Sequence, residues 1–317
     1  MESLDLRSSL RSLKGLFLLL LFHIFCPSKM KAMLRKALPG YDPKPDYEIP
    51  KYEEWMRVNN ARDLYLRETK GCESRAPEIV ALAYTLGADK LLEAEGQGSP
   101  DVAQRHQLEG DYADNVFKWV KNNIKYNMGG GTALETLEEG VGVSSTSLFI
   151  ALCRAGGLKA RWKISAEPDP RLKDLNELSK YRGKKFENVM SMLSKIAYGS
   201  SIAEVYIDGK WIPADPRFPD EFEAGIGYNI SKLGYEPEWM KTEEAIYLED
   251  YFSRVNRFIL NYFKKMDGLK GLMDQGLGLY TRIGWEKLEL GEEEYERRRK
   301  KSFKGSDEEL SSILKRL

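Results

Sequence analysis

Apolar residues return at helical spacing in the middle of the chain. Within Tyr112–Asn127 they fall at Val116, Trp119, Val120 and Ile124, which share one face of an α-helix. The positions between them are mostly polar or charged. The pattern predicts an amphipathic helix that packs this face against a core.

A second run, Ser147–Ala155, is apolar almost without interruption and predicts a buried helix. Gly156 and Gly157 follow it directly, and glycine suits the end of a helix. We expect further helices over Tyr52–Glu68 and Ala76–Glu95, and a helical chain from Glu238 onward.

Two β-prone runs, Ile202–Ile207 and Lys210–Ala214, are separated only by Asp208 and Gly209. An Asp-Gly link between such runs is a strong short-range signal for a β-hairpin. Ala160–Ser165 is a further strand candidate. Strands and helices therefore alternate irregularly, which predicts an α+β fold.

The N-terminal part contains one apolar run, residues 15–26, preceded by basic residues. Twelve residues fall short of the roughly 20 that a membrane-spanning helix needs. Two interpretations stay open: a signal anchor that tethers the chain to a membrane, or a misassigned extension before a start at Met30 or Met33. The first places the protein at a membrane and the second in the cytoplasm.

The chain divides into four parts by composition. The Pro-rich stretch Gly40–Lys51 is an expected linker, and the polar stretch Arg171–Tyr198 is an expected insertion. The predicted parts are a hydrophobic N-terminal segment, a linker with helices, a core, and a helical C-terminal region, covering residues 1–29, 30–109, 110–218 and 219–317.

Charge and composition exclude several classes of function. Lysine plus arginine equals aspartate plus glutamate, 49 each, so the basic excess of a nucleic-acid-binding protein is absent. The three cysteines show no CxxC spacing, which argues against a disulfide framework and a zinc knuckle. Only two histidines occur, His23 and His106. We expect no metal site and no cofactor.

Four segments in order resemble the transglutaminase-like superfamily, including its uncharacterised archaeal members. Asp114–Tyr126 resembles the leading helix of that family, and Thr132–Val143 resembles the approach to its nucleophile. Arg154–Arg161 (RAGGLKAR) is similar to the helix exit and first strand, and Ala203–Pro216 (AEVYIDGKWIPADP) to the catalytic hairpin. The resemblance implies a papain-type core, with a nucleophile-position helix packed on an antiparallel sheet.

In this family a Cys, a His and an Asp form the catalytic triad. The resemblance places the Cys at Ser144, or at Gly142 if the helix is read backwards from Arg154 without a gap. It places the His at Ser200 and the Asp at Asp215. Only the Asp position keeps its family residue.

No other residue is an obvious substitute. Cys153 lies nine residues beyond Ser144, about 13 Å along a helix, and is expected to be buried. His106 precedes the core in a polar stretch and is expected at the surface. Lys195 would need burial to act as a base, and nothing in the sequence indicates it.

The sequence thus predicts a catalytically degenerate transglutaminase-like protein that binds a peptide or protein partner. Two alternatives stay open. One is a hydrolase or acyl transferase that uses Ser144 and Asp215; the other is a structural or assembly protein. The enzyme needs a base near Ser144, because a serine hydroxyl is a weak nucleophile without one.

Overall fold

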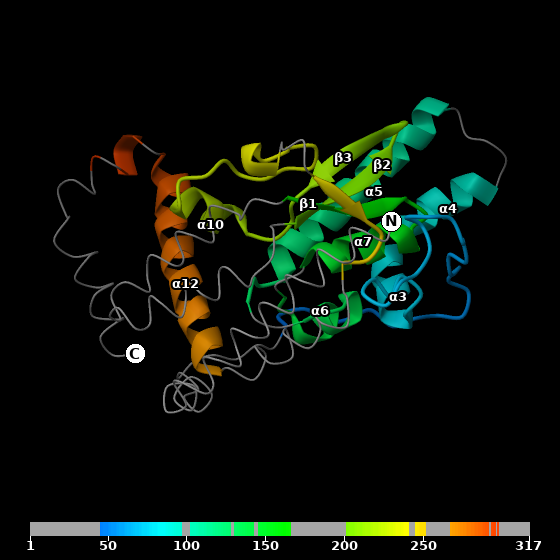
Figure 1. The fold of residues 1–317 in the computed structure, drawn as a ribbon, viewed down its shortest axis with the longest axis horizontal. Coiled ribbons are helices and arrows are strands. Elements are labelled where there is room, and N and C mark those ends of the chain that lie inside the picture. The colour runs from blue at the N-terminus through cyan, green and yellow to red at the C-terminus, as the bar shows by residue number, and fades with distance from the viewer. Residues whose placement is uncertain are drawn as a thin grey trace.

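The computed structural model describes residues 45–96, 102–127, 130–142, 145–165, 201–240, 245–251, 267–291, 293–295 and 297. Helices alternate irregularly along the chain with four strands, which form one antiparallel sheet (Figure 1). The helices are α3 (Pro77–Thr85), α4 (Ala88–Gly96), α5 (Val102–Asn123), α6 (Ala133–Glu139), α7 (Ser145–Ala155), α10 (Asp220–Gly225) and α12 (Asp267–Leu290), with a 3-10 turn, η2, at Glu238–Met240. The strands are β1 (Ala160–Ile164), β2 (Ser201–Ile207), β3 (Lys210–Ala214) and β4 (Ile246–Leu248).

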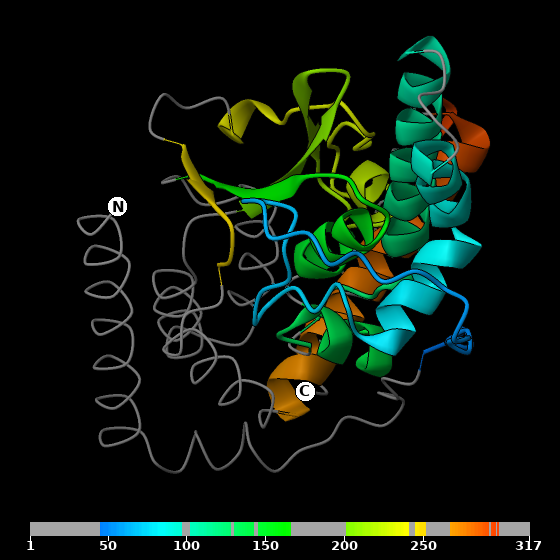
Figure 2. The same ribbon diagram turned by 90° about the vertical axis from the view of Figure 1, so that its right-hand side faces the viewer.

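Helix α7 is the centre of the core, because every one of its residues is buried. It contacts α3, α5 and α6 on one side and strands β1 and β2 on the other. Figure 2 shows it between the sheet and the other helices. The helix ends at Ala155, and Gly157 adopts φ = 90°, a left-handed conformation that glycine takes without strain. The prediction of a buried helix ending at these glycines is confirmed.

Strands β2 and β3 form the predicted hairpin. Their register pairs Val205 with Ile212 and Ile207 with Lys210, so only Asp208 and Gly209 make the turn. Both turn residues have positive φ, 49° and 74°. Two such angles are those of a type I′ turn, whose twist matches that of the strands.

Strand β1 lies between β2 and β4, and the sheet order is β3-β2-β1-β4. Trp162 and Ile164 of β1 point to the core side, where both are buried. β4 pairs with β1 at Trp162–Leu248 and Ile164–Ile246. The expectation of helix from Glu238 onward is therefore wrong at β4, a three-residue strand held by pairing to a segment some 85 positions earlier in the chain.

The helix predicted over Tyr52–Glu68 is also wrong. This segment contains turns and extended chain but no helix. Its backbone groups bond to distant parts of the fold instead: the amide of Ala160 donates to the carbonyl oxygen of Tyr65, and the Arg154 guanidinium donates to that of Arg67. Helix hydrogen bonds within the segment would leave these buried donors unpaired.

Two other helix boundaries differ from expectation. Ala76–Glu95 forms two helices, α3 and α4, because the chain turns at Gly87, where φ is 108°. α5 begins at Val102, ten residues before the predicted Tyr112. Its buried positions include Val116 and Val120, as the apolar pattern indicated.

The C-terminal helix α12 packs on the short helix α10, as Figure 1 shows at one end of the molecule. The two backbones touch at Gly225 and Gly284. A Cβ atom on Gly284 would lie 1.6 Å from the carbonyl oxygen of Glu221, and one on Gly225 would lie 1.9 Å from that of Tyr280. Glycine at both positions is what permits this close approach.

Two predicted segments, residues 15–26 and Arg171–Tyr198, lie outside the described residues. Among the helices that are described, none is long and apolar enough to cross a membrane. The described chain is an α+β fold in which a nucleophile-position helix packs on an antiparallel sheet, with further helices on both sides in sequence.

Candidate functional site

The family resemblance places the nucleophile position at Ser144, directly before helix α7. The helix begins at Ser145, the residue after Ser144. Ser144 and Ser200 both lie outside the described residues, so their mutual approach stays a prediction. Ser145 and Thr146 form the first turn and are 1% and 0% exposed. None of residues 141–147 is a cysteine, so this helix end has no thiol to activate.

Asp215, the expected triad acid, directly follows strand β3 and is fully buried. Arg217 holds both of its carboxylate oxygens. Nε of Arg217 donates to Oδ1 at 2.7 Å, and the terminal nitrogen NH2 donates to Oδ2 at 2.9 Å. Arg217 is itself only 4% exposed. This two-point pair is strong and fixed in direction, so an arginine orients the Asp215 carboxylate.

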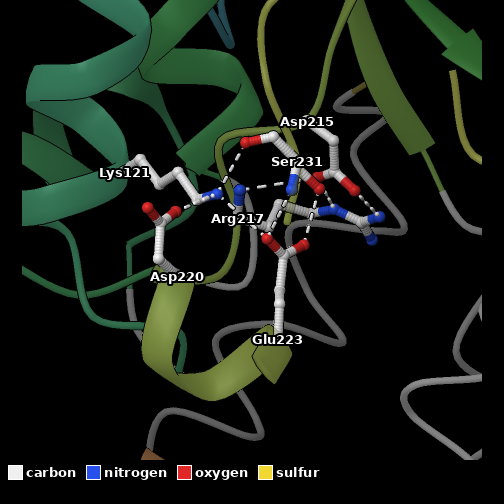
Figure 3. Close-up of polar contacts among 6 residues, drawn as sticks. All are labelled: Lys121, Asp215, Arg217, Asp220, Glu223 and Ser231. Atoms are coloured by element: carbon white, nitrogen blue, oxygen red, sulfur yellow. Dashed lines mark hydrogen bonds and ion pairs between the residues drawn. The ribbon is translucent and has the colours of Figure 1, made fainter. Parts of the chain in front are cut away.

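A second buried charge cluster lies beside this pair (Figure 3). Nζ of Lys121 on α5 donates to Glu223 at 2.9 Å and to the carbonyl oxygen of Ser231 at 2.7 Å, and lies 2.6 Å from Asp220. Ser231 returns two hydrogen bonds to the Glu223 carboxylate, from its amide at 2.8 Å and its hydroxyl at 2.6 Å. The three donor positions of the ammonium are all used, so Lys121 is a structural cation and not a free base.

The described cysteines are not nucleophiles. Cys153 is buried in the last turn of α7, and burial raises the pKa of its thiol far above the ordinary value. Cys72 is equally buried, and burial raises its pKa to about 12 although Arg154 lowers it. A thiol that stays protonated and out of solvent cannot attack a substrate. The prediction that Cys153 is a buried residue is confirmed.

His106 contacts the tip of the β2–β3 hairpin. Its Nδ1 is 3.0 Å from Oδ1 of Asp208, in the type I′ turn. The imidazole is 34% exposed, which agrees with the expected surface position. The second histidine, His23, and the candidate base Lys195 lie outside the described residues.

Two of the four segments that carry the family resemblance, Arg154–Arg161 and Ala203–Pro216, meet where strands β1 and β2 pair. Arg161 pairs in register with Glu204, and its Nε donates to Oε2 of Glu204 at 2.8 Å. The guanidinium also stacks between Trp211 and Tyr247, at 3.9 and 4.0 Å from their ring centroids. One side chain thereby ties all four strands together on the outer face of the sheet.

Arg154, in the other half of the same motif, is fully buried at the end of α7. Its guanidinium donates to three backbone carbonyl oxygens, those of Ala160, Arg67 and Glu249. These belong to β1, the N-terminal coil and the chain after β4. The arginine is a clamp between three segments, which accounts for its place in the motif without a catalytic role.

Arg217, Lys121 and Glu223 were not predicted from the sequence. Lys121 carried one signal, since it follows Val120 on the buried face of α5 and a lysine there requires a partner. Arg217 lies two positions after Asp215, one residue beyond the segment Ala203–Pro216 that resembles the family hairpin. The direction of the chain after β3 brings Arg217 to Asp215, and no pattern in the sequence indicates this pair.

Comparison with known proteins agrees with this geometry. Residues 99–216 match the family model of the transglutaminase-like superfamily. No curated protein matches the chain significantly. Among solved structures, a candidate cysteine protease from Cytophaga hutchinsonii is 19% identical, with a TM-score of 0.31. The match covers 59% of this chain and spans about half (50%) of that structure, and a score this low supports no conclusion about activity.

The matched residues include α5, α6, α7, β1 and the β2–β3 hairpin, and they end one residue after Asp215. All four segments that resemble the family lie inside this match, which contains no residue of α10 or α12. Residues 99–216 of this chain therefore form a transglutaminase-like domain.

Proposed function

We propose that this protein is a catalytically degenerate transglutaminase-like protein that binds a peptide or protein partner at the former active site. The observation that carries the proposal is the pair between Asp215 and Arg217. In a working triad the acid accepts a hydrogen bond from the histidine and orients it. Here both carboxylate oxygens accept from a buried guanidinium, 2.7 and 2.9 Å away.

The residues around the site support the same interpretation. The family resemblance places the Cys at Ser144, or at Gly142 when read back from Arg154, and the His at Ser200. A serine nucleophile needs a general base, and another serine does not provide one. Lys121 is a buried amine in the described part of the chain, and it already donates to Glu223 and Ser231. The domain has kept its fold while the proton-transfer groups are missing, which favours binding without turnover.

The test uses the full chain and a panel of unlabelled peptides of about ten residues with varied sequence. Binding is measured with the chain immobilised, and peptide masses are measured after prolonged incubation with the chain in solution. We expect saturable binding of a subset of peptides, with no change in any mass. Lys210→Met, at the exposed start of β3, serves as a control and is expected to bind as the parent does.

Two outcomes would overturn the proposal. Cleavage or acyl transfer that disappears in the Ser144→Ala variant would establish the hydrolase or acyl transferase alternative. In that case Asp215→Asn should lower the rate by orders of magnitude, as expected for an orienting acid. Failure of every peptide to bind would leave the structural or assembly role.

A further inference from the structure

The first turn of α7 contains two buried hydroxyl groups that make no hydrogen bond. Oγ of Ser145 and Oγ1 of Thr146 have no partner among the described residues. The two residues are 1% and 0% exposed, so bulk solvent does not reach them. Buried polar atoms in native proteins are nearly always paired, and an exception requires an explanation.

Backbone donors at the same place add to this shortage. The first amides of any α-helix have no acceptor within the helix. The amides of Ser145 and Thr146 are two of these, because α7 begins at Ser145. Helix α6 shows the ordinary solution: the Thr132 side chain accepts from the amide of Glu135, and Glu73 accepts from that of Leu134.

The field at this end of α7 favours a negative charge. The aligned peptide dipoles of the helix place a partial positive charge at its N-terminus. The first turn has no acidic residue to neutralise it. Hydroxyl and amide donors at a helix N-terminus together form an anion-binding arrangement. Among the anions that such donors bind, a peptide or protein partner supplies a carboxylate.

We propose that the first turn of α7 binds a carboxylate group through Ser145 and Thr146. This inference rests on the proposed function and names the chemical class of the ligand: a peptide that presents its C-terminal carboxylate or an acidic side chain. The unpaired hydroxyls are then binding groups whose partner arrives with the ligand. Because both are buried in the free chain, the ligand enters only when covering residues move aside, and association is slower than diffusion allows.

The chain offers a matched pair of variants. Thr146 and Thr136 are both fully buried, but Oγ1 of Thr136 donates to the carbonyl oxygen of Thr132 at 2.7 Å. Valine has nearly the shape of threonine without the hydroxyl. We expect Thr146→Val to leave the free chain as stable as the parent or more so, because it removes an unpaired polar group. Thr136→Val is expected to lower stability and to keep ligand binding.

The experiment titrates the isotope-labelled full chain with sodium acetate, against sodium chloride at the same ionic strength. We expect the amide resonances of Ser145 and Thr146 to shift in saturable fashion with acetate and not with chloride. Thr146→Val should weaken acetate binding about tenfold or more, the effect of one hydrogen bond to a charged group.

Peptides separate this inference from the proposed function. Peptides that bind in the panel are remade with an amidated C-terminus, or with alanine at each acidic position, which distinguishes the two sources of carboxylate. If they bind equally well after both changes, the carboxylate inference is wrong and the proposed function stands. If acetate shifts these amides but no peptide binds, the proposed function is wrong and the carboxylate site stands. Absence of any acetate shift, or an unchanged shift in Thr146→Val, overturns the inference.

Discussion

Lys121 and Glu223 form a buried ion pair between α5 and α10, with Nζ 2.9 Å from Oε2 and side chains 4% and 0% exposed. Replacing Lys121 by methionine leaves the Glu223 carboxylate buried without its cation. We expect the free energy of unfolding to fall by about 3–5 kcal/mol, measured by chemical denaturation.

The matched control for this prediction is Lys118→Met on the same helix. Lys118 also pairs with a carboxylate, that of Asp114 at 2.5 Å, but its side chain is 67% exposed. Solvent screens such a pair, so the loss should be about 1 kcal/mol or less. Equal effects of the two substitutions would show that the buried pair does not tie α10 to α5.

The parts of the fold that follow from local chemistry were predictable. The β2–β3 hairpin depends on Asp208 and Gly209, whose positive φ angles suit these two residue types. The burial of α7 depends on its own apolar run. The resemblance motifs also placed Asp215 correctly at the end of β3.

The rest depends on contacts between distant segments. Strand β4 has three residues, and only its pairing with β1 makes it a strand. The coil over Tyr52–Glu68 contains helix-forming residues, yet Arg154 and Ala160 compete for its carbonyl groups. Arg217 was not predicted for a similar reason, because the family pattern specifies the acid and not the residue that pairs with it. Whether Ser144 faces Ser200 stays a prediction.

Gly156 admits the ring of Tyr112 to the end of α7. A Cβ atom at Gly156 would lie 2.2 Å from Cε1 of this ring. Tyr112 cannot move away easily, since it is buried and its hydroxyl donates to the carbonyl oxygen of Leu152 at 2.5 Å. We expect Gly156→Ala to lower the free energy of unfolding by about 1–3 kcal/mol.

Gly110, in the interior of α5, provides the opposite case. A Cβ atom there meets nothing within 4 Å. Gly110→Ala should raise the free energy of unfolding by about 0.5–1 kcal/mol, because alanine favours the helix. Opposite signs for the two Gly-to-Ala changes are the expected result, and a stabilising Gly156→Ala would contradict the packing described.

Gly284 fixes the distance between α12 and α10. With a Cβ atom only 1.6 Å from the Glu221 carbonyl oxygen, Gly284→Ala must separate the two helices. We expect faster amide hydrogen exchange over α12, with exchange in α7 unchanged. Gly278→Ala on the same helix meets nothing within 4 Å and should not speed exchange. Protection of α12 that survives Gly284→Ala would contradict the close contact.

Thiol reagents should not modify the folded core. Burial raises the pKa of the Cys72 thiol to about 12, so the thiol stays protonated at pH 8. Cys153 is equally buried, and its pKa is also raised.

A Cys26→Ser variant restricts the measurement to these two residues. We expect no labelling by iodoacetamide in native buffer and labelling of both in denaturant, followed by mass spectrometry. Native labelling of Cys153 that blocks a turnover would reverse the proposed function.

Asp274 on α12 should make stability depend on pH. Partial burial raises the pKa of its carboxyl above the ordinary value, and Lys125 opposes this only in part. A raised pKa in the folded chain means that folding disfavours the charged form. The resulting penalty is absent below the unfolded pKa, about 3.9, and is complete above the folded one. Asp274→Asn should therefore stabilise the protein at neutral pH, and the gain should vanish in acid.

Glu286→Gln, at an exposed position of the same helix, is the control and should change stability by about 0.5 kcal/mol or less. If Asp274→Asn is destabilising at neutral pH, attraction to Lys125 outweighs the cost of burial.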